Sequence, residues 1–224
     1  MIIGWMRAFV DRPAELRAEA VRFWAAVTGT EPADGGLLVP AKGDAHVEVR
    51  SGAALALEVA DVEAALTVAR ALGAEAIEAG ETEAVVRSPG GTVFRLEQWS
   101  GAAERSPVVG DADVFQVCVD VPAAAFDEEV AFWSRWTGWP SREAARPEFA
   151  VVQPPDAMPF RLLIQRLEDG GPGAHLDLAC PDRAATRARH EELGARALRE
   201  LPWWTVMEDP AGGTYCLIAA RPAS

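Results

Sequence analysis

The sequence predicts an α+β protein made of two tandem copies of one domain. Residues 54–96 align without a gap on residues 175–217, and twelve of the 43 aligned positions are identical. An earlier segment, 8–29, aligns in the same way on 117–138. Because the period of this repeat exceeds a hundred residues, it indicates duplicated domains and not a solenoid of short units.

Each copy is predicted to open with a strand and an amphipathic helix. The apolar stretches 4–11 and 113–120 run into an Asp-x-Pro sequence, which is typical of a strand that meets a turn. A Phe-Trp pair then marks the apolar face of a helix that stops at Thr-Gly, a C-terminal helix signal. Short strands complete this first half of each copy.

A second strand–helix unit follows within each copy. The strands 54–59 and 175–180 lead to Asp61 and Asp182, whose carboxylates are expected to cap the next helix. Each of these helices ends at Leu-Gly-Ala. The last two strands flank a tight turn that contains Pro and Gly. Each copy is therefore predicted to contain two βαβββ modules.

Length and composition indicate where the domains lie and which classes of partner are excluded. We place the domains at 1–103 and 112–224, joined by a linker of small and polar residues. The net charge of −13 argues against nucleic acid and against anionic membrane surfaces. No apolar run reaches the length of a membrane span, and we find no secretory signal. An odd number of cysteines fits a reducing cytoplasm, where we expect the protein to reside; they are Cys118, Cys180 and Cys216.

Three motifs, in order, carry a resemblance to a known superfamily. They are FWAAVTG with its repeat FWSRWTG, HLDLACPD before a helix that ends in LGA, and WTVMEDPAGGTYCL. With these motifs the chain resembles the vicinal-oxygen-chelate superfamily, which includes glyoxalase I, extradiol dioxygenases and bleomycin-resistance proteins. The resemblance implies tandem glyoxalase-like domains, each a cupped, incomplete barrel of two βαβββ modules that binds its ligand inside the cup.

The resemblance also implies where a metal would be held. Metal-dependent members use inward-facing residues from the first strand of each module and from a late strand. Carried over to the second copy, these positions are His175, Cys216 and Asp113, and Gln165 offers a fourth ligand. This mixed set would suit Zn²⁺ better than Mg²⁺. We therefore expect either no cofactor or one divalent metal ion.

The first copy is blank at the same positions. It has Gly4, Ala54 and Arg95 there, from which no metal site can be built. If Arg95 points into the first cup, it is expected to bind a carboxylate or phosphate; if not, it faces solvent or pairs with a nearby acid such as Glu97.

The second copy has features of a binding mouth. It is twelve residues longer than the first between Gly138 and His175, and extra loop length often shapes a binding site. Tryptophans such as Trp136 and Trp204 occur only in this copy. They are expected either to offer flat apolar area to a planar ligand or to pack in the core.

Two main functions remain open from the sequence. The first is a protein that binds or sequesters an apolar or aromatic small molecule, with Arg95, Gln165, Trp136 and Trp204 as ligand-binding residues. The alternative is a metal-dependent lyase, isomerase or dioxygenase centred on His175. No catalytic residue is assigned. Because two fused domains are similar to the dimer that one-domain members form, we expect a monomer or a homodimer.

Overall fold

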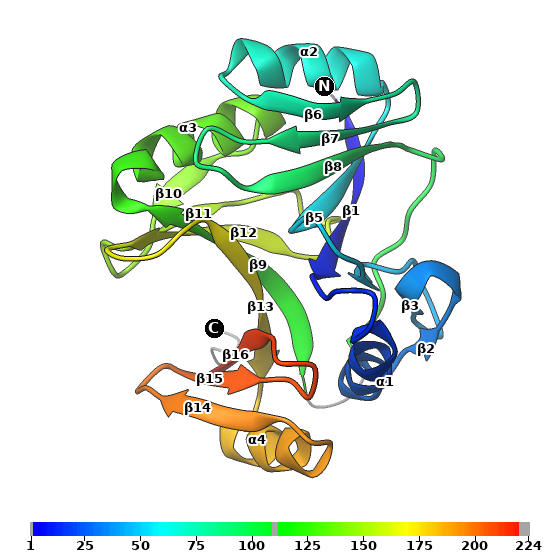
Figure 1. Ribbon diagram of the computed structural model, residues 1–224, viewed down its shortest axis with the longest axis vertical. Coiled ribbons are helices and arrows are strands. Elements are labelled where there is room, and N and C mark those ends of the chain that lie inside the picture. The colour runs from blue at the N-terminus through cyan, green and yellow to red at the C-terminus, as the bar shows by residue number, and fades with distance from the viewer. Residues whose placement is uncertain (1, 109–111, 220–224) are drawn as a thin grey trace.

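The computed structural model describes residues 2–108 and 112–219, which form two eight-stranded mixed sheets (Figure 1). The strand order is β2-β3-β4-β1-β5-β8-β7-β6 in the first sheet and β10-β11-β12-β9-β13-β16-β15-β14 in the second. The second order is the same as the first when eight is subtracted from each strand number. Neither sheet closes into a barrel, which confirms the predicted α+β class with cupped, incomplete barrels.

The first half contains β1–β8. Its elements are β1 (Ile3–Val10), α1 (Arg17–Thr28), β2 (Glu31–Pro32), η1 (Asp34–Gly36), β3 (Leu37–Val39), β4 (Val47–Val49), β5 (Leu55–Val59), α2 (Val62–Ala71), β6 (Glu75–Ala79), β7 (Glu83–Arg87) and β8 (Val93–Gln98).

The second half contains β9–β16. Its elements are β9 (Asp113–Pro122), η2 (Ala123–Ala125), α3 (Phe126–Thr137), β10 (Ser141–Glu143), β11 (Phe149–Val152), β12 (Arg161–Leu167), β13 (Gly173–Cys180), α4 (Arg183–Glu192), β14 (Arg196–Glu200), β15 (Trp204–Glu208) and β16 (Thr214–Ala219).

The predicted helix signals are found at the helix ends. Asp61 accepts a hydrogen bond from the amide of Ala64, and Asp182 accepts from two amides of the first turn of α4. The helices α1 and α3 end at Gly29 and Gly138, whose φ angles of 65° and 76° lie in the left-handed region that favours glycine. Local sequence thus sets where these helices begin or stop.

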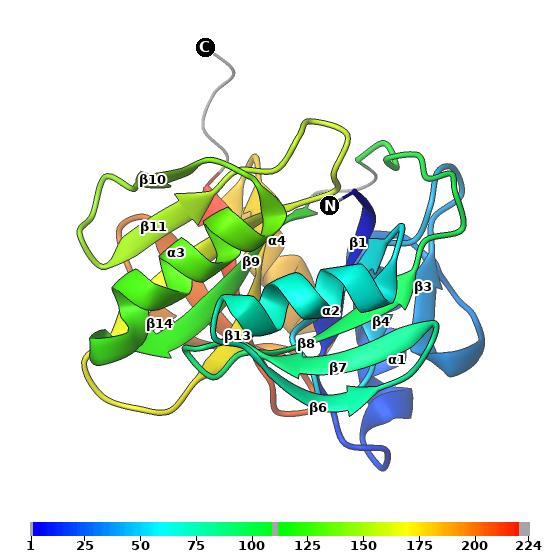
Figure 2. The same cartoon turned by 90° about the horizontal axis from the view of Figure 1, so that it is seen from above.

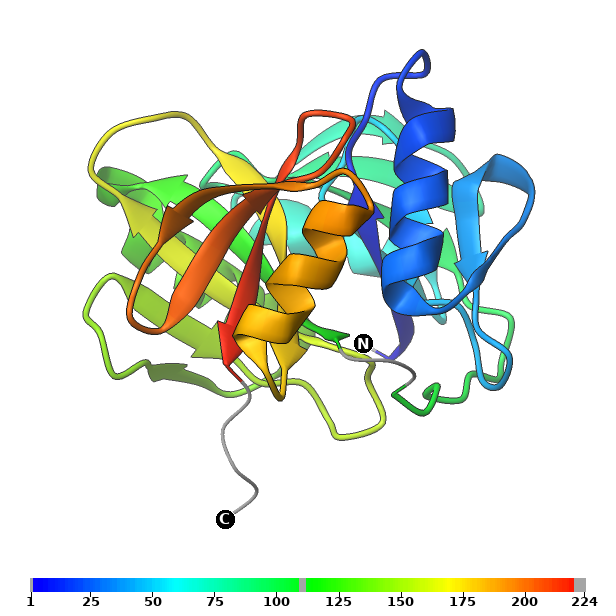
Figure 3. The ribbon, with the colours of Figure 1, turned by 90° about the horizontal axis from the view of Figure 1, so that it is seen from below.

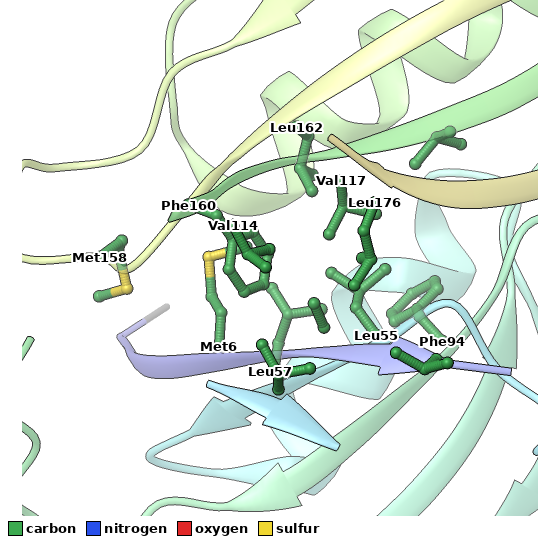
Figure 4. Packing of buried hydrophobic residues seen from close by; sticks show 14 of the residues in the cluster. Met6, Leu55, Leu57, Phe94, Val114, Val117, Met158, Phe160, Leu162 and Leu176 are labelled. Carbon is green, nitrogen blue, oxygen red and sulfur yellow. The ribbon is translucent and has the colours of Figure 1, made fainter. Parts of the chain in front are cut away.

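One continuous core joins the two halves. In Figure 4, Met6, Leu55 and Leu57 of the first sheet face Val117 and Leu176 of the second. The helices cover the convex side of each sheet. Each helix lies beside a helix of the other half: Figure 2 shows α2 beside α3, and Figure 3 shows α1 beside α4. The concave face of each sheet points away from this core. Among the described residues, no helix is long and apolar enough to cross a membrane.

Candidate functional site

The concave face of the second sheet, which we call the second cup, carries a row of polar side chains. His175 and Asp177 lie two residues apart on β13, so strand alternation directs both to the same face. Directly opposite them on β9 are Cys118 and Gln116, and Cys216 on β16 pairs with Asp177. Three neighbouring strands thus bring together residues that are as many as 100 positions apart.

Hydrogen bonds and one longer polar contact link these side chains into a row. The ring Nδ1 of His175 lies 3.0 Å from Asp120 Oδ2, and its Nε2 lies 3.6 Å from Asp177 Oδ1. The amide of Gln116 donates to the other oxygen of Asp177, and the Nε of Arg161 donates to Gln116 at 2.7 Å. His175 is therefore held between two carboxylates, each of which is fixed by the surrounding strands.

Burial and charge act against each other at His175. Burial alone lowers the pKa of its ring, and neighbouring groups, Cys118 and Asp120 among them, raise that pKa well above the ordinary value. Burial raises the pKa of Cys118 to about 12, so this thiol is neutral at neutral pH. Among these neighbours the carboxylate is Asp120, whose hydrogen bond with Nδ1 favours the protonated ring.

The thiol and the second carboxylate near His175 also have shifted pKa values. Burial raises the pKa of Cys216 and of Asp177, and the His175 ring opposes both shifts. Asp177 Oδ1 is buried without a hydrogen bond. An orphaned buried oxygen of this kind is uncommon and calls for an explanation.

Two groups of side chains in the second cup have the composition of metal ligands. The first is Cys118, Asp120 and His175, and the second is His175, Asp177 and Cys216; the ligand atoms of each group lie within 4.8 Å of one another. In the second group, Asp120 would orient the ring through Nδ1, and Gln116 would fix Asp177. Such outer partners accompany most metal-binding histidines.

Gln165 and Trp204 also lie on the second cup. The Cys118 thiol donates to Gln165 Oε1 at 3.4 Å, which places the amide beside the cluster. Trp204 on β15 meets Phe149 on β11 edge to face, with ring centroids 6.2 Å apart, and Arg146 lies over the Trp204 ring at 5.3 Å. Phe149, Trp204 and Arg146 form the mouth of the second cup.

The structure separates Asp113 from His175, which corrects its expected place. Asp113 pairs with Ala179, whereas His175 pairs with Cys118. Because β9 and β13 are antiparallel, residues near the start of each strand lie at opposite ends of the pair. Four residues of strand correspond to roughly 13 Å. Asp113 instead lies near Arg105 and His46.

Trp136 likewise does not reach the second cup. It is buried at the junction of the two halves, where its indole nitrogen donates to the Ala65 carbonyl at 3.0 Å. Its ring packs against Phe94 and Phe132. The helix α3 that carries Trp136 covers the convex side of the sheet, so none of its buried side chains can face the concave side.

The first cup is filled by ion pairs. Arg7 contacts Glu48, Glu58 and Glu97, and Arg50 joins two of these acids. Burial and the charge of Glu97 raise the pKa of Glu58, and Arg7 opposes this shift. The network lies on the face of the first sheet that corresponds to the polar cluster of the second.

Arg95 is directed into the first cup and is part of this network. It pairs with Glu83 at 2.7 Å and with Glu97 at 3.4 Å. Arg95 thus combines the direction of one sequence-based alternative, into the cup, with the acid partner of the other, Glu97.

Four cup residues were missed from the sequence: Gln116, Cys118, Asp120 and Asp177. Their signal is strand alternation. Gln-x-Cys-x-Asp on one strand and His-x-Asp on the next place polar groups on a single face between apolar residues. The motif positions that predict metal ligands do not depend on strand alternation, so they do not point to these four residues.

A family model described as a glyoxalase-like domain matches the chain twice, at residues 7–97 and 116–218. A search of curated proteins gives no match. Solved structures with a similar fold include a halotolerant catechol dioxygenase (13% identity over 97% of this chain and 86% of that one, TM-score 0.59). They also include a mutant 4-hydroxymandelate synthase from Streptomyces coelicolor (16% identity, 99% and 93%, TM-score 0.60).

A catechol 2,3-dioxygenase is similar to the same degree, with 12% identity, coverage of 99% and 89% and a TM-score of 0.59. At these identities the likeness shows the fold alone. The two family-model matches cover most of the sequence, one in each half. The chain therefore belongs to the glyoxalase-like domain family and carries two tandem copies of the domain.

Proposed function

We propose that this protein binds a small molecule in the second cup. The observation that carries the proposal is the buried polar cluster around His175. Burying such groups costs free energy, and strongly shifted pKa values in a concave site are typical of functional groups. The first cup has the same strands but holds a network of ion pairs instead.

The walls of the second cup suit an apolar or aromatic ligand. Strand pairing places Val151, Leu163 and Val206 on the same face as the polar cluster. Trp204 and Phe149 add aromatic surface at the mouth. An apolar lining with a few convergent polar groups is the usual composition of a small-molecule site.

Thermal unfolding with a panel of planar aromatic acids, phenols and natural-product fragments tests this proposal. A compound present at about 100 times its Kd should stabilise the protein by about 2.7 kcal/mol. The shift should shrink in His175→Ala and Trp204→Ala but persist in Arg95→Ala, which changes only the first cup. A compound that binds all three variants like the parent protein would contradict the location.

A second candidate function is a metal-dependent lyase, isomerase or dioxygenase. It is favoured by Asp177 Oδ1, which is buried without a hydrogen bond and faces Nε2 of His175. His175, Asp177 and Cys216 would hold the ion, and their mixed nitrogen, oxygen and sulfur set suits Zn²⁺. Such an ion polarises a bound substrate oxygen.

Elemental analysis of the purified protein and of His175→Ala distinguishes the two candidates. About one equivalent of metal in the parent protein, and none in the variant, would support the enzyme. Absence of metal from both proteins after incubation with Zn²⁺, Fe²⁺ and Mn²⁺ would leave ligand binding alone. Asp113→Asn serves as the control, because it removes an acid that lies away from the cluster.

A further inference from the structure

The mouth of the second cup is closed by two arms of the sheet that are not neighbours. Phe149 is on β11 and Trp204 is on β15, and four strands lie between them in the sheet order. Their ring contact therefore spans the concave face and is not a contact between adjacent strands. Arg146, at the turn of the β10–β11 hairpin, covers the Trp204 ring from the same side.

The polar cluster behind this contact is mostly buried, although the side chains of His175 and Asp120 are still 16% and 18% exposed. Gln116 and Asp177 are each 3% exposed, and Cys216 is 7% exposed. The helices pack on the convex face, so they cannot cover these residues. The side chains on the concave face that can cover them are Val151, Leu163 and Val206 beside the cluster and the contacting pair Phe149 and Trp204.

The tip of the β10–β11 hairpin has the construction of a movable arm, whereas its base is anchored, because Ala150 and Val152 of β11 lie in the core and pair with β12. All three residues of β10 are exposed, and the strand lies at the edge of the sheet. The nearest ion pair of Arg146 is with Glu148 in its own turn, so it does not tie the arm to the rest of the protein. The hairpin spans residues 141–152, whereas its counterpart in the first half spans only 31–39.

The first half lacks this closure. The alignment of the two copies places Glu83 at the position of Trp204, and Glu83 pairs with Arg95. The extra length and the aromatic residue thus occur together in the half that has the polar cluster.

We propose that Phe149, Trp204 and Arg146 form a gate that controls access to the cluster around His175. Opening requires the tip of this hairpin, with Arg146 and Phe149, to move away from β15. A flat aromatic ring then takes the place of Phe149 against Trp204, which makes planar ligands the class that the gate admits. The ligand specificity rests on the function proposed above, whereas the gate itself does not.

The reaction of Cys216 with a small neutral thiol reagent, methyl methanethiosulfonate, measures gate opening without any ligand. Peptide mass spectrometry gives the rate at Cys216 and, in the same sample, at Cys180, which is buried in the core and serves as an internal reference. The reaction is run with a chelator so that a bound cation does not protect the sulfur.

Trp204→Ala and Phe149→Ala are each expected to raise the Cys216 rate at least tenfold relative to Cys180. Arg146→Ala is expected to raise it several-fold. Trp203→Ala is the matched control, because this neighbouring tryptophan is 67% exposed and lies outside the mouth; it should leave the rate unchanged.

Equal rates at Cys216 in the parent protein and in all three gate variants would overturn the gate. If Trp204→Ala also speeds Cys180, it has loosened the fold, and Arg146→Ala, which removes a half-exposed side chain, then decides. Faster Cys216 labelling with no ligand-dependent thermal shift would uphold the gate and refute the proposed ligand binding. The two failures are therefore distinguishable.

Discussion

The two cups share a strand order but differ in what fills them. In the first, three arginines and four glutamates form a network of ion pairs, in which the Nε of Arg95 is buried without a hydrogen bond. In the second, the equivalent strands carry His175, two acids and two thiols, and one oxygen of Asp177 faces His175 without a hydrogen bond. This difference is the basis for the proposal that the second copy binds a ligand, whereas the first fills the equivalent face with ion pairs.

The two junctions between the halves also differ, in which half supplies a buried carboxylate. Asp209, in the last turn of the second half, accepts from Trp24 of α1 at 2.9 Å. At the equivalent junction the turn residue is Ser88, and Glu129 of α3 supplies the carboxylate. The indole of Trp133 again donates to that carboxylate. One buried carboxylate is present at each junction, although it comes from opposite sides.

The largest effect is expected from Arg7→Met in the first cup. It leaves Glu48, Glu58 and Glu97 without their shared cation, and loss of one partner from a buried ion pair costs about 3–5 kcal/mol. Urea unfolding measures the change. Arg87→Met, which breaks an exposed pair with Glu75, should change stability by less than about 0.5 kcal/mol. A similar small effect for Arg7→Met would mean that the first cup is not structural.

A comparable loss is expected from Glu129→Ala at the junction. The substitution leaves Ser88, the Gly90 amide and the Trp133 indole without their acceptor. A hydrogen bond to a charged group contributes about 1.5–3 kcal/mol, so the unfolding free energy should fall by at least that amount. Gly90→Ala gives an independent check, because its added carbon would lie 2.7 Å from the Glu129 carboxylate.

Asp120→Asn tests the second cup through its outer partner. If His175 binds Zn²⁺, weakening the partner of its Nδ1 should lower zinc affinity about 10–100-fold. Competition with a chromophoric chelator measures this affinity. Asp113→Asn should leave it unchanged, since β9 carries Asp113 to the far end of the strand pair. Equal losses of zinc affinity in the two variants would mean that Asp113 does belong to the site.

The smallest effect is expected from Arg95→Ala. Its partner Glu83 is 60% exposed at the side chain, and pairs of this kind contribute about 0–1 kcal/mol. Ligand binding in the second cup should be unaffected. A ligand whose affinity falls in this variant would show that the first cup also binds, and the comparison between the cups would then fail.

The sequence alone determined the duplication, the order of elements and the class of fold. These rest on local signals: alternating apolar residues, Asp caps and Gly stops, each repeated in the second copy. It also singled out His175 and Cys216, which the structure brings into one cluster. The face of each strand residue was readable as well, because alternation depends only on neighbours in the chain.

Only the tertiary structure decided which residues meet. The pairing of antiparallel β9 with β13 places Cys118 opposite His175 and carries Asp113 away, and this register depends on contacts far apart in the chain. The curvature of the sheet brings Phe149 to Trp204, and packing between the halves buries Trp136. Such distances are set by how whole sheets pair, bend and pack, and no short segment of sequence encodes them.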